Sequence, residues 1–151
     1  MPRNVSFAFR GFRPEDTPPS GATLVTGGRF VCGRNSRQPD PTGQSLPSDL
    51  SLRVYDRRGA LDEAATMAIS RHHFDLVVAN GRLCVQTRTT RGMEINGQAS
   101  IAGALVPVGP ADKVVPIPGR AEKLALQFNF ASAHGVVERI DVMRTPSHSA
   151  Q

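Results

Sequence analysis

Three short polar segments of the chain carry the side chains best suited to bind an anion. They lie far apart in the sequence: Gly33-Arg34, Ser70-Arg71-His72-His73, and Thr89-Thr90-Arg91-Gly92. An arginine presents a planar set of N–H donors that matches a phosphate or a carboxylate, and hydroxyl groups supply short donors beside it. A fold that brings the three segments together would offer a phosphate a guanidinium, hydroxyl donors and free backbone N–H groups.

Catalysis is a weaker interpretation of the same residues. Ser70, His73 and Asp75 include the residue types of a hydrolytic triad, but no nucleophile-elbow sequence surrounds Ser70. The four histidines have no cysteine or carboxylate at a recognised metal-ligand spacing, and the chain lacks a glycine-rich nucleotide loop. We therefore expect a protein that is not an enzyme and that needs neither a metal ion nor a cofactor.

The composition indicates one domain with an anionic partner. The 151 residues suffice for one packed core, and two cysteines, Cys32 and Cys84, are too few for a disulfide framework and are expected to be buried. Arginine supplies 16 of the 18 cations, and the formal net charge is +5. Such a charge suits nucleic acid or a phosphorylated protein. Because no apolar run approaches a membrane span and the first residues lack the apolar stretch of a signal peptide, we expect a cytoplasmic protein with no membrane partner.

Apolar residues alternate with polar ones along much of the chain, which is typical of half-buried β-strands. The alternation predicts strands over 50–54, 74–79, 82–86, 124–130 and 136–142, and Val5, Phe7 and Phe9 predict an edge strand near the N-terminus. Asn80-Gly81 and Asn96-Gly97 predict tight turns. Residues 62–68 are compatible with one or two helical turns, and the proline-rich stretch 35–48 is expected to be a long loop. The pattern predicts an all-β domain.

The order and spacing of the polar segments resemble the forkhead-associated (FHA) domain, a family of phosphothreonine-binding modules. That family shows Gly-Arg after its second strand, then Ser-x-x-His before a later strand, then Ser-Thr-Asn-Gly-Thr followed by Asn-Gly. The matching segments here are Gly33-Arg34, Ser70-x-x-His73, and Thr89-Thr90-Arg91-Gly92-Met93 with Asn96-Gly97. Two positions depart from the family, since Arg91 replaces its usual asparagine and Met93 its following threonine.

The resemblance covers roughly residues 23–130 and implies a fold and a function. The fold would be an FHA/SMAD-like β-sandwich of two mostly antiparallel sheets. Residues 1–22 would form a partly flexible N-terminal extension, and residues 131–151 an extra C-terminal strand and tail. The function would be to bind a threonine-phosphorylated protein, the target of a Ser/Thr kinase, in signalling or in the regulation of a secretion complex.

The resemblance also implies a role for each site residue. The residues expected to bind the phosphopeptide are Arg34, Ser70, Arg71, Thr89, Thr90 and Arg91. The residues expected to support the site are Gly33, His73, Gly92, Asn96 and Gly97. Among the supporting residues, His73 would brace the binding loops from behind without touching the ligand.

Two alternative functions remain open at the level of sequence. Arg91 and Met93 motivate a degenerate FHA fold that binds a protein partner independently of phosphate. The charge of +5 motivates a basic nucleic-acid-binding β-domain. Seven phenylalanines and one tyrosine lie mostly at positions in phase with the core, which leaves few aromatic platforms for bases. Nucleic acid is therefore the less favoured partner.

Overall fold

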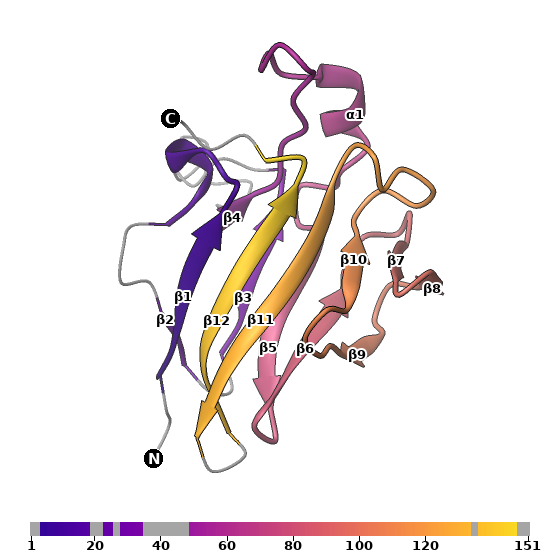
Figure 1. Cartoon of the computed structure of the whole chain (residues 1–151). Coiled ribbons are helices and arrows are strands. Elements are labelled where there is room, and N and C mark those ends of the chain that lie inside the picture. The colour runs from indigo at the N-terminus through magenta and orange to yellow at the C-terminus, as the bar shows by residue number, and fades with distance from the viewer. Residues whose placement is uncertain (1–3, 19–22, 26–27, 35–48, 134–135, 148–151) are drawn as a thin grey trace, which may run out of the picture.

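The strands form two layers in the computed structural model, which describes residues 4–18, 23–25, 28–34, 49–133 and 136–147 (Figure 1). The seven-stranded sheet contains, in spatial order, β2 (Thr23–Val25), β1 (Asn4–Arg10), β12 (Val136–Thr145), β11 (Ala125–Ala133), β10 (Lys113–Val115), β7 (Met93–Ile95) and β8 (Gln98–Ser100). The five-stranded sheet contains β4 (Leu50–Ser51), β3 (Phe30–Gly33), β5 (Phe74–Ala79), β6 (Arg82–Thr87) and β9 (Leu105–Pro107). Neighbouring strands are antiparallel except in the pairs β1–β12 and β3–β4. The predicted all-β fold of two mostly antiparallel sheets is confirmed.

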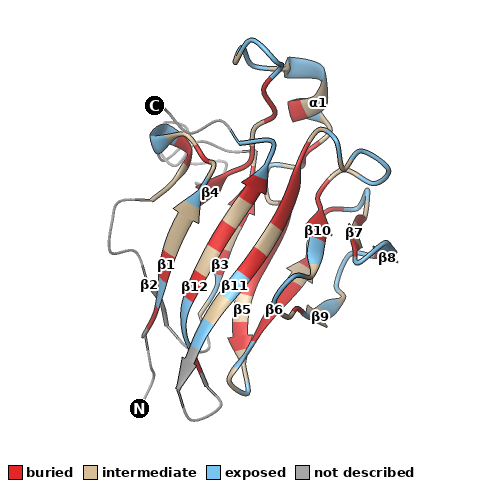
Figure 2. Ribbon diagram, in the orientation of Figure 1, coloured by how far each residue is buried: buried red, intermediate tan, exposed pale blue. Residues whose placement is uncertain are grey.

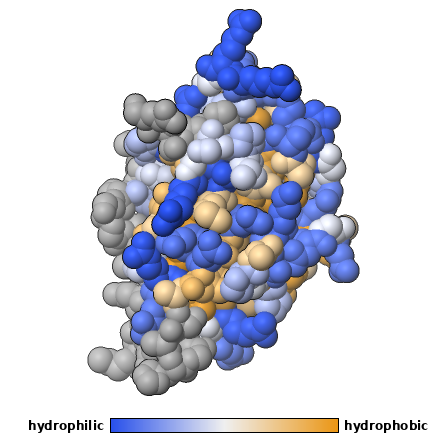
Figure 3. Space-filling view, in the orientation of Figure 1, coloured by the Kyte–Doolittle hydropathy of each residue, from blue (hydrophilic) through white to orange (hydrophobic). Residues whose placement is uncertain are grey.

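One hydrophobic core lies between the two sheets. Alternate residues of β11 and β12 are buried, and Figure 2 shows the alternation along both strands. Phe128 from the seven-stranded sheet and Phe74 from the five-stranded sheet are both fully buried in this core. Cys32 and Cys84 are buried free thiols, as expected. Figure 3 shows the outer face of the seven-stranded sheet, where hydrophilic side chains are interspersed with hydrophobic ones.

Both Asn-Gly pairs form the predicted tight turns. Asn80 and Gly81 have φ angles of 54° and 77° between β5 and β6, and Asn96 and Gly97 have the same values between β7 and β8. Positive φ at both central residues is what a two-residue type I′ hairpin turn requires. Asparagine and glycine adopt this conformation at the lowest cost, so local sequence chemistry sets these two hairpins.

The N-terminal strand lies inside its sheet, not at the edge as the alternation suggested. β1 pairs antiparallel with β2 on one side and parallel with β12 on the other. Its inward residues Val5 and Phe7 are buried in the core. The two terminal segments thus contribute strands to one sheet, and β11 runs through the predicted boundary after residue 130. The division of the chain at 22/23 and 130/131 stays a prediction.

The strand predicted over 50–54 is short, and a helix explains where it ends. β4 stops at Ser51, and the Val54 N–H donates to the Thr66 hydroxyl (3.0 Å) instead of to a neighbouring strand. Thr66 belongs to α1 (Glu63–Met67), which confirms the predicted helical turns. Asp62 caps this helix by accepting the Ala65 N–H (3.1 Å). The predicted loop 35–48 lies outside the described residues. No helix in the described ranges has the length and apolar character needed to span a membrane.

Candidate functional site

Three loops meet at the end of the sandwich where α1 lies (Figure 1). β3 ends at Gly33, β5 begins at Phe74 and β6 ends at Thr87. Because β3 is antiparallel to β5 and β5 to β6, these three strand ends are neighbours. Sheet topology therefore gathers the polar segments that are far apart in the sequence. We call Arg34, Ser70, Thr89 and Arg91 the candidate anion site.

The Arg34 guanidinium is held at its Nε end by a backbone carbonyl, whereas its other end has no partner among the described residues. Its backbone N–H donates to the Ser70 carbonyl (3.0 Å), and its side-chain Nε donates to the Ile69 carbonyl (2.9 Å). The two Nη groups have no hydrogen-bond or ion-pair partner among the described residues. Gly33 permits this close packing, since a Cβ atom there would lie 2.0 Å from the Arg71 carbonyl oxygen. The arginine thus presents a half-buried, oriented pair of donors.

The hydroxyl groups of Ser70 and Thr89 are linked. Their oxygens lie 2.7 Å apart, and Thr89 is 2% exposed. Thr89 Oγ1 also accepts the backbone N–H of Arg91 (3.2 Å). Either hydroxyl can be the donor of this pair, and when Thr89 donates to Ser70, the Ser70 proton is left for an external acceptor. In that arrangement the Arg91 N–H donates to Thr89 and Thr89 donates to Ser70, which lies at the candidate anion site.

His73 holds the loops together from within the core. Its Nδ1 accepts the Ser70 N–H (2.9 Å), and its Nε2 lies 2.7 Å from the Pro116 carbonyl. These two partners assign a neutral ring with the proton on Nε2. The ring is fully buried, and this burial, opposed by the Pro116 hydrogen bond and reinforced by the Arg91 charge, lowers its pKa to about 4. The backbone carbonyl of His73 accepts the N–H groups of Arg88 and Thr89 (2.9 Å each).

Arg91 lies on the exposed side of the candidate anion site. Its Nη1 donates to the Met67 carbonyl (2.9 Å), just as Arg34 donates to Ile69. No sequence pattern predicts these two carbonyls as partners, since every residue type has the same backbone acceptor. Arg71 and Thr90 are both exposed, and Thr90 makes no hydrogen bond to the described residues. The structure thus joins Thr89, not Thr90, to Ser70.

The remaining supporting residues build the neighbouring hairpin. Asn96 Oδ1 accepts the Lys113 N–H (2.9 Å), which ties the β7–β8 turn to β10. Gly92 has a φ of 78° and turns the chain from the candidate anion site into β7. Met93 is 1% exposed and belongs to the core, so its side chain neither lines nor blocks the site.

A buried carboxylate, Asp75, lies beside the site, and the sequence analysis did not pair it with His72. Asp75 is fully buried, with one oxygen 2.5 Å from His72 Nε2 and the other accepting Arg88 Nε (2.9 Å). The i,i+3 spacing of His72 and Asp75 was a signal that could have found this pair. Asp75 does not join the hydrogen bonds of His73, so Ser70, His73 and Asp75 form no linked series. Within the described ranges, no three His, Cys, Asp or Glu side chains are placed to share a metal ion.

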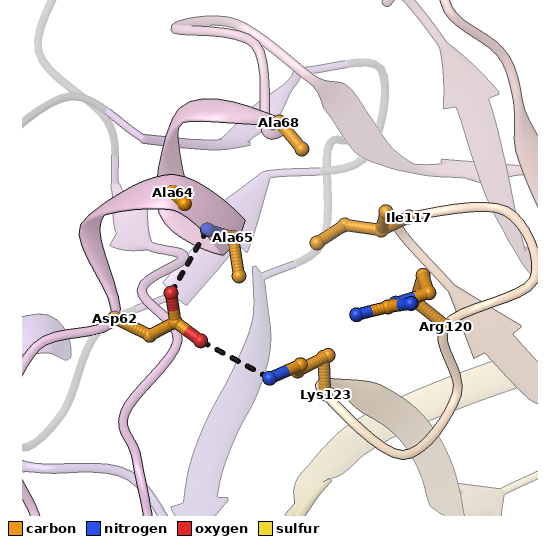
Figure 4. A pocket seen from close by; sticks show the side chains of 7 residues that line it. All are labelled: Asp62, Ala64, Ala65, Ala68, Ile117, Arg120 and Lys123. Atoms are coloured by element: carbon orange, nitrogen blue, oxygen red, sulfur yellow. Dashed lines mark hydrogen bonds and ion pairs between the residues drawn. The ribbon is translucent and has the colours of Figure 1, made fainter.

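A hollow of about 350 Å³ lies between α1 and the segment that follows Pro116 (Figure 4). Its lining residues are Asp62, Ala64, Ala65, Ala68, Ile117, Arg120 and Lys123. Lys123 Nζ donates to Asp62 (3.2 Å), which ties the two walls together. The Ala65 N–H and Lys123 lower the pKa of Asp62, so this carboxylate is anionic at neutral pH.

No family profile matches the chain, and no curated protein matches it. Among solved structures, it is similar to the X-ray structure of the N-terminal FHA domain from S. cerevisiae Rad53p in complex with a phosphothreonine peptide. The two are 14% identical with a TM-score of 0.39, and the match covers 77% of this chain and 65% of that one. The chain thus spans about 65% of the length of that structure.

Proposed function

We propose that the chain is an FHA-type module that binds a threonine-phosphorylated protein, the target of a Ser/Thr kinase, in the cytoplasm. One observation carries the proposal: three distant segments converge so that the Arg34 Nη donors and the linked Ser70 and Thr89 hydroxyls share one end of the sandwich. The order of these segments along the chain is also that of the FHA family. Signalling and the control of a secretion complex are the proposed settings.

The chemistry of the site suits a phosphate dianion. A phosphothreonine carries about −1.5 to −2 charges and three strong acceptor oxygens. Neither Arg34 nor Arg91 has a carboxylate partner among the described residues, so two guanidinium groups lack a compensating charge. The Arg34 guanidinium would donate hydrogen bonds to the phosphate, and the Ser70 hydroxyl would donate to a phosphate oxygen. Arg71 and Thr90 stay predicted contacts at the exposed rim.

The test is calorimetry on the full chain with peptides from a degenerate library that fixes one phosphothreonine. The best binder is then compared with its unphosphorylated and phosphoserine forms. We expect binding to need the phosphate, and phosphoserine to bind about fourfold more weakly if one methyl group is buried. Arg34→Ala should weaken binding by about tenfold or more, since a charged hydrogen bond contributes roughly 1.5–3 kcal/mol. Arg139→Ala, which removes an exposed arginine paired with Asp141 on β12, is the matched control.

Three results would contradict the proposal. Equal affinity for the phosphorylated and unphosphorylated peptides would indicate a phosphate-independent fold. Tight binding of an oligonucleotide with a steep dependence on salt would indicate a nucleic-acid-binding domain. Unchanged affinity of an Arg34→Ala protein that melts like the parent would remove Arg34 from the site.

A further inference from the structure

Each sheet ends, on the same side of the molecule, in a short strand (Figure 1). β8 is the last strand of the seven-stranded sheet, and β9 is the last strand of the five-stranded sheet. A turn over residues 101–104 joins them, and in it the Ala104 N–H donates to the Ile101 carbonyl (3.1 Å). A strand at the edge of a sheet has backbone groups that pair with no neighbouring strand, and these groups can pair with a strand of another chain.

The backbone of Leu105 in β9 points away from its sheet. The Ala104 carbonyl accepts the Thr87 N–H (3.0 Å), so the backbone of Ala104 faces β6. Because the backbone groups of successive residues in a strand point to opposite sides, those of Leu105 and Pro107 point away from β6. Proline has no N–H. Within β9, Leu105 therefore carries the outward donor, and both residues carry an outward carbonyl.

The edge at β9 is also apolar and uncharged. Leu105 is 49% exposed, and Ile101 in the preceding turn is 74% exposed. Residues 95–111 contain no Asp, Glu, Lys, Arg or His, although charged residues make up 21% of the chain. Edge strands that stay unpaired commonly carry charged side chains, lysine above all. β9 lacks this protection, which is typical of a surface that a partner covers.

A second copy of the chain fits this edge better than an acidic or a basic partner. The formal net charge is +5, so two copies repel each other over much of their surface. The repulsion is smallest at an uncharged edge, where apolar side chains of one copy also meet apolar side chains of the other. Leu105 has an outward donor and an outward carbonyl, so the edge is complementary to itself. A twofold axis uses the edge once in each copy and closes the assembly at two chains.

We infer that two copies of the chain associate by antiparallel pairing of β9 with β9, which joins their five-stranded sheets into one. Each copy donates its Leu105 N–H to an outward carbonyl of the other copy. The two Leu105 side chains lie on the same face of the joined sheet and pack together. Pro107, which has no donor, keeps the paired segment short.

The pairing also determines how the two candidate anion sites are placed. β9 begins beside the end of β6, where the chain enters the candidate anion site. Antiparallel pairing of β9 therefore directs the two sites to opposite ends of the joined sheet. The association itself does not rest on the proposed function, but with that function one dimer would hold two phosphorylated proteins at the same time.

The test is sedimentation equilibrium of the full chain at concentrations from about 10 μM to 1 mM, a range that suits a small interface. We expect the parent to change from monomer to dimer and to form no larger species. Leu105→Lys places like charges opposite each other in the dimer and should raise its dissociation constant about tenfold or more. Leu61→Lys adds the same charge at a leucine that is 44% exposed and lies outside the edge, so it is the matched control. Its dissociation constant should stay within about twofold of the parent value.

Amide hydrogen exchange, followed by NMR, locates the contact without a variant. The Leu105 amide should exchange about fivefold or more slowly at the highest concentration than at the lowest, because the dimer pairs it. The Val106 amide faces β6 and should exchange equally slowly at both concentrations. Leu105→Lys should melt like the parent, since it replaces an exposed side chain.

A parent chain that stays monomeric at every concentration would overturn the inference and leave the edge to a strand of a different protein. A dimer that Leu105→Lys does not weaken, or that Leu61→Lys weakens equally, would overturn it as well. So would exchange of the Leu105 amide that does not depend on concentration. Phosphopeptide affinity per chain should be the same for Leu105→Lys and the parent, so the failure of this pairing is distinguishable from the failure of the proposed function.

Discussion

His73→Gln should remove a large part of the pH dependence of folding. His73 is fully buried and neutral, and its ring links the Ser70 N–H to the Pro116 carbonyl. Burial lowers the pKa of the ring from its ordinary 6.5 to about 4. The unfolded chain therefore binds a proton at this residue from about pH 6.5 downward, whereas the folded chain does so only near pH 4. Between these values the unfolded state holds more protons, so stability falls as the pH is lowered.

The expected magnitude follows from the two pKa values. Each pKa unit corresponds to about 1.4 kcal/mol, so His73 should cost the parent roughly 3 kcal/mol of stability between pH 7 and pH 4. Glutamine does not titrate and offers both a donor and an acceptor. The carboxylates titrate in both proteins, so their contribution cancels when the parent and the variant are compared. The variant should therefore lose roughly 3 kcal/mol less than the parent over this range.

The assay is urea unfolding of both proteins at several pH values, followed by circular dichroism. Nitrogen NMR of the parent should show the His73 proton on Nε2 at neutral pH. Equal pH dependence of the two proteins would refute the buried neutral histidine, as would a proton on Nδ1. His73→Gln should lower phosphopeptide affinity only indirectly, through a displacement of the Ser70 loop, since His73 does not face the candidate anion site.

Substitutions at Gly33 and at the linked hydroxyls of Thr89 and Ser70 test the packing of the site. Gly33→Ala should lower the free energy of unfolding by about 2–3 kcal/mol and weaken phosphopeptide binding, since its Cβ would overlap the Arg71 carbonyl. In the control variant Gly109→Ala, the added Cβ has an ordinary contact of 3.7 Å, and the free energy of unfolding should change by less than about 0.5 kcal/mol. Equal unfolding midpoints for the two variants would contradict the close approach at Gly33. Thr89→Val should lower phosphopeptide affinity about five- to tenfold in calorimetry, since its hydroxyl is linked to that of Ser70. When Ser70→Ala is added to the Thr89→Val variant, the affinity should fall little further. Fully additive losses of affinity would show that the two hydroxyls act separately.

Local chemistry in the sequence was enough to predict the strands and turns that frame the site. Alternation predicted β5 and β6, and Asn80-Gly81 predicted the turn between them, because side-chain period and φ preference act over a few residues. The order of the polar segments likewise pointed to one shared anion site. Whether its residues contact a phosphate stays a prediction.

The sequence was not sufficient to predict which strands pair with each other or which backbone groups share a hydrogen bond. Alternation predicted β1 but not its place between β2 and β12, since the parallel pairing of the two chain ends has no local signature. The strand expected over 50–54 does not continue along β3, since the Leu52 N–H still donates to Gly33 but the Val54 N–H donates to Thr66, a helical residue. Both outcomes depend on residues that are distant in sequence.

Residue types and their order along the chain specify which side chains are available for anion binding, whereas the packing of distant segments controls how these side chains are presented. Thr89 and Thr90 are identical in type and adjacent, yet one is buried against Ser70 and the other is exposed. The carbonyls of Met67 and Ile69 orient Arg91 and Arg34, although any residue type offers the same acceptor. Burial and backbone acceptors arise only when distant segments pack together, which is why the composition and spacing of the chain could not specify them.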